Sequence, residues 1–261
     1  MTAILNMIGR NSIPVVTILG FLVVWQLLVV LFEVPSWLLP SPLTIWTTFL
    51  KDASMLGRHV VATGTGAVGG LVIGALGGIA LAVLMVQSRL LERILMPLLV
   101  IDQSIPKMAL APIFVIWFGA GMMSRIVIAM VISFFPMIVN TVRGMKSVDP
   151  RVNQLMETLS ARRWHVLTKV KMPNAVPYVF VGLKVAVPLA IIGAVVAEFM
   201  QADSGLGYVV LIAVGNVNTP LVFVAVVLMA ALSLGLFALV SIVEALILRR
   251  RFAYLALADE H

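Results

Sequence analysis

The chain contains six apolar runs, each about as long as a helix that crosses a lipid bilayer. A membrane-spanning helix needs roughly 20 apolar residues. In lipid, only helices and closed barrels satisfy the backbone, and these runs have helical length and no apolar–polar alternation. The sequence therefore predicts an all-α, polytopic membrane protein with about six transmembrane helices. The expected spans are Ile13–Phe32, Val60–Val86, Ile94–Phe118, Ile126–Met145, Tyr178–Met200 and Leu221–Leu248.

Composition supports a membrane protein and excludes several kinds of site. Of the 261 residues, 62% are hydrophobic and 11% are charged, against about 45–50% and about 25% in soluble domains. The chain has no cysteine, and its three histidines are scattered, so we expect no metal site and no cofactor. The first run is long for a signal core and ends in Glu33-Val34-Pro35, so we expect a retained first helix.

The distribution of Lys and Arg predicts the orientation in the membrane. Thirteen of the 18 cations fall on the side that holds the N-terminus, and two, Lys107 and Lys184, lie within apolar runs. The opposite side holds Lys51, Arg58 and Arg125. By the positive-inside rule, both termini and the loop at 149–177 are expected in the cytoplasm. The same rule accounts for the net charge of +7 without a nucleic-acid partner.

Two further segments carry helix signals. Ser41-Pro42 is typical of a helix start, and Leu43–Leu50 is expected to form a short interfacial helix that serves as a spacer on the outer surface. In the second run, glycine recurs at every fourth residue and gives one smooth helical face that allows close approach. We expect this face to pack within the chain, with a dimer seam as the alternative. Its members are Gly66, Gly70, Gly74 and Gly78.

The third run is interrupted by polar residues and prolines, from Asp102 to Pro112. Ionisable groups at membrane depth cost about 2.5–3.5 kcal/mol each and usually face a cavity or a partner. We therefore expect a broken helix in which Gln103, Ser104 and Lys107 line a solute pathway, where Lys107 would suit an anion. The alternative is that Asp102 and Lys107 pair structurally or reach toward water.

Three other charged residues lie near the later runs. Lys184 is expected to reach the cytoplasmic surface. Glu198 is expected either to bond to the turn at 203–207 or to contact solute. Glu244 is expected to pair with the Arg249–Arg251 end or to face water there.

The loop at 149–177 is the most polar stretch of the chain. Asp149 is suited to N-cap a helix and Pro150 to begin it. We expect a short helix, a break near Ser160, and a second short helix stopped by Pro173 and Pro177. A basic helical loop outside the membrane indicates a docking surface, although its arginines also fit the positive-inside rule alone.

Catalytic motifs are missing from the sequence. It has no Gly-rich phosphate loop ending in Lys-Ser/Thr, no Gly-x-Ser-x-Gly and no His-Glu-x-x-His. We therefore expect no catalytic residue, no enzyme activity and no ATP binding by that device. A solute-conducting subunit powered by another protein fits best. The alternatives are a stand-alone secondary transporter or channel, and a structural membrane subunit.

The loop resembles the signature loop of permeases of ATP-binding-cassette (ABC) importers of the binding-protein-dependent kind. That signature is Glu-Ala-Ala, three residues, Gly, nine residues, Ile-x-Leu-Pro. Anchoring it on Met172-Pro173 puts Val170 in the isoleucine place, Ser160 in the glycine place, and Gln154 in the glutamate place. Glu157 lies close to the same helical face and is a candidate to replace that glutamate. Ser160 could instead N-cap the second helix.

The resemblance covers about Leu39 to Arg250 and is closest to the nitrate, sulfonate and taurine branch, which also includes presumed importers of pyrimidine precursors, riboflavin and aromatic acids. It rests on four groups of residues in the expected order, which are Leu39-Pro40-Ser41-Pro42, Ile105-Pro106-Lys107 with Ala109 and Pro112, Trp117-Phe118-Gly119, and Glu198 with Gly205-Leu206-Gly207.

The resemblance implies one permease domain, residues 1–261, of the type I importer fold in a bacterial inner membrane. It implies a homodimer, two cytoplasmic ATPase subunits, an extracytoplasmic solute-binding protein, and a loop at about 149–173 that couples ATP hydrolysis to transport. Trp164 and Leu167, three residues apart, are expected to be apolar anchors on one face. The implied coupling residues are Gln154, Glu157, Ser160, Arg163, Trp164, Leu167 and Pro173.

Overall fold

The computed structural model describes residues 2–200 and 203–258, and these residues form helices and no strand. The predicted all-α class is therefore confirmed for the described chain. The longer helices are α1 (Thr2–Leu31), α2 (Pro42–Gln87), α3 (Arg89–Ser104), α5 (Met122–Lys146), α8 (Met172–Glu198) and α10 (Thr219–Ala258). The shorter ones are η1 (Lys107–Leu110), α4 (Ala111–Phe118), α6 (Pro150–Thr158), α7 (Arg163–Val166), η2 (Leu167–Lys171) and α9 (Leu206–Gly215).

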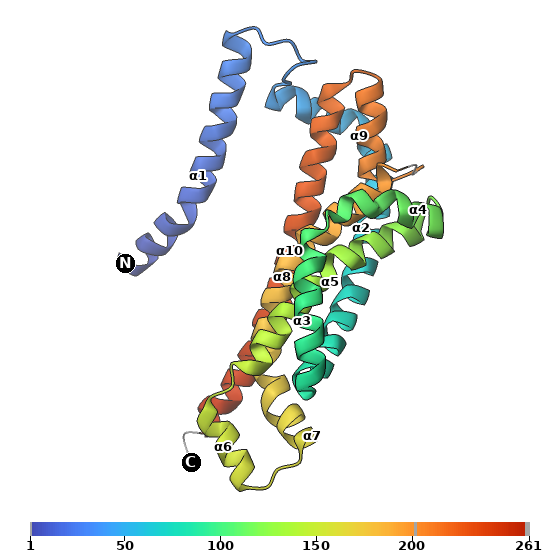
Figure 1. Cartoon of the computed structure of the whole chain (residues 1–261). Coiled ribbons are helices and arrows are strands. Elements are labelled where there is room, and N and C mark those ends of the chain that lie inside the picture. The colour runs from blue at the N-terminus through green and yellow to red at the C-terminus, as the bar shows by residue number, and fades with distance from the viewer. Residues whose placement is uncertain (1, 201–202, 259–261) are drawn as a thin grey trace.

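Helices α2, α5 and α8 form the centre of the bundle (Figure 1). The glycine face of α2 packs on α5 in a constant register, with Gly66 on Arg125, Gly70 on Ala129, Gly74 on Ser133 and Gly78 on Met137. A Cβ added at Gly70 would lie 2.4 Å from the Cβ of Ala129. The two helices therefore pack in parallel at a separation that only glycine allows, and the expected packing within the chain is confirmed.

The third apolar run is broken, as predicted. Helix α3 ends at Ser104, and η1 with α4 continues at an angle of 84°. Ile105 has an extended backbone (φ −83°, ψ 123°), the conformation that the residue before a proline favours. Pro106 has no N–H to continue the helical ladder, so the break falls where the sequence places it.

The count of six spans is not established by the structure. Four helices are long and apolar enough to cross a membrane, and the bent pair of α3 with η1 and α4 makes a fifth if it counts as one span. In α1, the described apolar helix covers Val16–Leu31 and is shorter than a full span. The expected span at Ile13–Phe32 therefore stays a prediction.

Two features near the start of α2 differ in part from expectation. Ser41 N-caps α2 as predicted, because its Oγ accepts a hydrogen bond of 3.2 Å from the N–H of Thr44. The segment Leu43–Leu50, however, is the first part of the 46-residue α2 and not a separate helix. Helix α1 stands away from the bundle (Figure 1) and meets it near its C-terminal end, where the ring of Trp25 lies 5.9 Å from that of Phe223.

Candidate functional site

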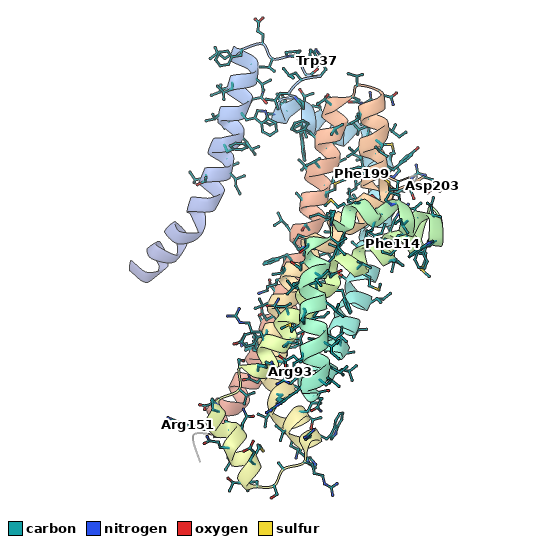
Figure 2. The ribbon with its side chains drawn as sticks, in the orientation of Figure 1. Trp37, Arg93, Phe114, Arg151, Phe199 and Asp203 are labelled. Carbon is teal, nitrogen blue, oxygen red and sulfur yellow. The ribbon has the colours of Figure 1, made fainter. Side chains whose placement is uncertain are left out.

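The loop between α5 and α8 lies at one end of the bundle, beside the C-terminal part of α10 and opposite to α9 (Figure 1). Arg151 at this end and Asp203 at the other are far apart in Figure 2. Asp149 N-caps α6 by accepting a 2.8 Å hydrogen bond from the N–H of Arg151. The expected first helix of the loop is therefore present.

Helix α6 ends in a Schellman motif centred on Ser160. The N–H of Ser160 donates to the carbonyl of Glu157, and the N–H of Ala161 donates to that of Met156, both at 2.9 Å. Ser160 has a φ of +49°, the left-handed conformation that favours glycine. The break near Ser160 is therefore confirmed, and Ser160 has the backbone shape expected in the glycine place. It does not N-cap the second helix, because Arg162 holds that position.

Trp164 and Leu167 do not share a face, contrary to expectation. Leu167 is 2% exposed and packs with Met145 and Ala175, so it fixes the loop to the bundle. Trp164 is 66% exposed. Leu167 begins η2, the π-helical turn that leads into α8, and its side chain faces the bundle there.

Pro173 and Pro177 do not stop the second helical segment. Helices α7, η2 and α8 continue without a break from Arg163 to Glu198. In the wide turn, the N–H of Met172 donates to the carbonyl of Leu167, five residues earlier. This spacing accommodates a proline at 173, whose ring would otherwise crowd the carbonyl four residues before it. The loop is therefore joined rigidly to the central helix α8.

The remaining loop candidates are at the surface. Gln154, Glu157, Ser160 and Arg163 are all exposed, and Pro173 is partly buried. Two further large apolar side chains, Leu155 at 55% and Leu159 at 65% exposure, accompany Trp164 on the loop. These leucines were not among the predicted coupling residues, although their spacing of four residues on one helix face was a signal in the sequence.

The pathway candidates lie at the bend of the broken span. Gln103 and Lys107 line a cavity of about 440 Å³ together with Ile132, Pro136 and Leu189. Ser104 is exposed and does not line it, and its hydroxyl lies 3.5 Å from the carbonyl oxygen of Val100. Lys107 Nζ lies 2.7 Å from Asp102 Oδ2. The structural pair that the sequence left open is therefore present within the candidate pathway.

A buried polar cluster near the opposite end joins four helices, and Glu198 is its centre. The Glu198 side chain is 0% exposed and accepts hydrogen bonds of 2.8 Å from the hydroxyl of Thr63 and from the N–H of Gly207. The Thr63 hydroxyl accepts a bond of 2.8 Å from the N–H of Leu206. Of the two roles expected for Glu198, the bond to the turn is the one that the structure contains.

Arg125 supplies the positive charge of this cluster. Its Nε lies 3.7 Å from Glu198 Oε1, and its Nη2 donates to the carbonyl and to the hydroxyl of Ser204, both at 2.9 Å. Its side chain is only 4% exposed, so this cation is buried within the cluster. His59 Nδ1 also accepts a 3.0 Å bond from the N–H of Gly205. No sequence pattern indicated Thr63, Arg125 or His59, because each partner lies far away along the chain.

A second ion pair joins α8 and α10, where Lys184 Nζ contacts Glu244 Oε2. Lys184 also lies 5.8 Å from the ring centre of Phe237. Lys184 and Glu244 therefore pair with each other, and neither expectation named that partner; their side chains are 27% and 18% exposed. The side chains of Arg250 and Arg251 lie outside the described residues, so the expected contact of Glu244 with the Arg249–Arg251 end stays a prediction. Two unpaired charges inside a helix bundle are costly, and pairing them removes that cost.

Metal binding is not supported by the described part of the chain. Among residues 2–200 and 203–258, no group of three or more His, Cys, Asp or Glu side chains is placed to hold a metal ion. The geometry is that of a helix bundle with an open cavity beside its broken span and an exposed loop at one end.

Comparisons with known proteins identify the family. A family model described as "Binding-protein-dependent transport system inner membrane component" matches residues 70–252. The chain is 36% identical to the riboflavin transport system permease protein RibX of Chloroflexus aurantiacus, over 90% of this chain and 88% of that protein. It is 35% identical to the formylaminopyrimidine transport permease protein ThiX of Halalkalibacterium halodurans, over 90% and 94%.

A third relative is the putative aliphatic sulfonates transport permease protein SsuC of Bacillus subtilis. It is 31% identical to this chain, over 88% of the chain and 84% of that protein. The family model covers the broken span, the exposed loop, and Arg125 and Glu198 of the buried cluster. The chain therefore belongs to the family of binding-protein-dependent inner-membrane permeases of ABC importers.

Proposed function

We propose that this chain is the subunit that forms the solute pathway of an ATP-driven importer. It works as a homodimer, with the whole chain as one permease domain in a bacterial inner membrane and both termini in the cytoplasm. Two ATPase subunits bind the loop at 149–173, and a solute-binding protein delivers solute on the opposite side. The solute is a small molecule in the range that the relatives' names span, from riboflavin and formylaminopyrimidine to aliphatic sulfonates.

The observation that carries this proposal is the form of the loop. Leu155, Leu159 and Trp164 are each more than half exposed on a short helical loop beyond the long helices (Figure 1). Large apolar side chains exposed outside the membrane mark a protein–protein contact. The arginines at 151, 162 and 163 add positive charge to the same loop, which favours an acidic partner surface.

Movement of the ATPase would reach the pathway through α8. Leu167 anchors the loop against Met145 and Ala175, and α7, η2 and α8 form one continuous helical rod. The cavity beside Lys107 is lined in part by Leu189 and Ile192 of this rod. Because the chain stays helical from Trp164 to Leu189, we expect a push on Trp164 to reach the cavity wall.

The test is ATPase activity in liposomes that contain the chain and its partner ATPase, with stimulation by binding protein plus solute as the readout. Trp164→Ala and Glu157→Ala are expected to weaken assembly with the ATPase or to lose stimulation. Trp37→Ala is the matched control for assembly with the ATPase, because Trp37 is similarly exposed (61%) but lies at the opposite end (Figure 2). If no version binds an ATPase and the chain transports alone, the proposal is wrong and a stand-alone carrier replaces it.

A further inference from the structure

The cavity at the bend of the broken span has a charge balance that the sequence did not reveal. Among its described lining residues, Lys107 carries the one charge. That ammonium lies 2.7 Å from the carboxylate of Asp102 and 5.8 Å from the ring centre of Phe135. The Lys107 side chain is 14% exposed, whereas that of Asp102 is 45% exposed. The charge that would attract an anion is therefore already neutralised, and the more accessible partner is the negative one.

We propose that Asp102 is a selectivity residue, which cancels the charge of Lys107 so that the pathway passes a polar solute of zero net charge and rejects anions. This inference rests on the function proposed above, because it assumes that the cavity belongs to the pathway. It reverses the expectation that Lys107 serves an anionic solute.

Electrostatics favours this assignment over an anion site. Asp102 does not itself line the cavity, but its carboxylate lies 2.7 Å from Lys107 Nζ. An anion in contact with Lys107 is therefore close to that carboxylate, and two like charges at close range repel strongly where the dielectric constant is low. To replace Asp102, the anion would leave that carboxylate without its partner at membrane depth. Binding an anion would therefore exchange the Lys107–Asp102 ion pair for another ion pair of Lys107, with no net gain.

A neutral polar solute meets no such obstacle. The Lys107 ammonium has three N–H donors, so it can donate to a solute and keep its bond to Asp102. The Gln103 amide, which also lines the cavity, can both donate and accept. Ile132, Leu189 and Ile192 supply apolar walls for the rest of the solute.

The absence of cysteine from the sequence allows a direct test of the local potential. Gln103→Cys places a single thiol in the cavity wall of the full chain, in membrane vesicles from cells that express it. The thiol is modified with an anionic sulfonatoethyl methanethiosulfonate and with a cationic trimethylammonioethyl methanethiosulfonate. The ratio of the two rates, divided by the ratio for a free thiol in solution, reports the potential at position 103 without knowledge of the solute.

With Asp102 and Lys107 present, the normalised ratio is expected to lie near one. Adding Asp102→Asn should shift it about tenfold toward the anionic reagent, and adding Lys107→Gln should shift it about tenfold toward the cationic reagent. Making both changes should return it to near one. If the Asp102→Asn variant does not accumulate in the membrane, the shift toward the cationic reagent in Lys107→Gln tests whether the pair sets the potential at position 103.

Two results would overturn the proposal in distinguishable ways. In the first, the thiol at 103 reacts, but the rate ratio does not change in Asp102→Asn or already favours the anionic reagent tenfold with the pair intact. Either outcome contradicts the selectivity role of Asp102 and leaves the proposed function standing. The control is Trp37→Cys, at an exposed position outside the cavity. If that thiol reacts with both reagents and the one at 103 with neither, the cavity is no aqueous pathway and both proposals fail there.

Discussion

Gly205 lies directly against the carboxylate of Glu198. A Cβ atom added at Gly205 would be 2.1 Å from the Cδ of Glu198, and the backbone there has a φ of +108°. Two residues later, the N–H of Gly207 donates to the same carboxylate at 2.8 Å. The end of α8 and the start of α9 are therefore held together by a buried charge that touches backbone, which leaves no room for another side chain.

Gly205→Ala is expected to lower the free energy of unfolding by about 1–3 kcal/mol, because it adds backbone strain and displaces the carboxylate. The measurement is thermal denaturation of the detergent-solubilised protein, followed by size-exclusion chromatography. Gly215→Ala is the matched control, since nothing lies within 4 Å of a Cβ added at that end of α9. Equal losses in both variants would contradict the close contact.

Thr63 links Glu198 to the N–H of Leu206, so its hydroxyl is expected to contribute to stability. Thr63→Val keeps the shape and leaves a buried carboxylate and a buried N–H each short of a partner, at a cost of about 1–3 kcal/mol. Thr63→Ser retains the hydroxyl and should retain most of the stability. The same denaturation assay distinguishes the two, and a serine variant as unstable as valine would show that packing, not the hydroxyl, is what matters.

Ser160→Gly is expected to stabilise the exposed loop. Ser160 adopts a positive φ that costs a non-glycine residue roughly 1–2 kcal/mol, and glycine removes most of that strain. Resistance of the loop to limited proteolysis should therefore increase. Thr158→Gly, at the last residue of α6, should have the opposite effect, by roughly 0.5 kcal/mol, because it lowers helix propensity and removes the hydroxyl bond to the carbonyl of Gln154. If both substitutions loosen the loop, the left-handed conformation of Ser160 is not what limits its stability.

Gly70→Ala should destabilise the α2–α5 contact. The added methyl group would lie 2.4 Å from the Cβ of Ala129 and 2.6 Å from the carbonyl oxygen of Ile126, and overpacking of this kind costs about 1–3 kcal/mol. Gly57→Ala in the same helix meets nothing within 4 Å and should be neutral or slightly stabilising. Comparison of their melting temperatures is the measurement, and a neutral Gly70→Ala would argue against the close packing.

The ion pair between Lys184 and Glu244 predicts a double-mutant result. Lys184→Met alone leaves Glu244 unpaired in an apolar bundle and should destabilise by about 3–5 kcal/mol. Lys184→Met combined with Glu244→Met removes both charges and should recover most of that loss. Expression level and thermal denaturation of the three variants are compared. Additive losses would mean that the two residues do not depend on each other.

Local sequence patterns determined much of this protein. The apolar runs, the proline at 106 and the capping residues at 41 and 149 each act on neighbours within a few residues, so their effects on the helices were predictable. The break at Ser160 followed in the same way. The glycine face of α2 showed that a helix would approach closely, although not that α5 would supply it.

Only the tertiary structure decided how the buried charges are paired and which loop residues face outward. Glu198 meets a hydroxyl 135 positions away, and Lys184 meets a carboxylate 60 positions away. A pattern in the sequence reports neighbours along the chain, whereas these partners are brought together by helix packing. In the same way, the packing against Met145 of α5 and Ala175 of α8 buries Leu167, whereas Trp164 stays exposed. An unpaired charge is costly inside the bundle because the dielectric constant there is low, so each buried charge needs a partner. Helix packing in the folded protein determines which residue that partner is.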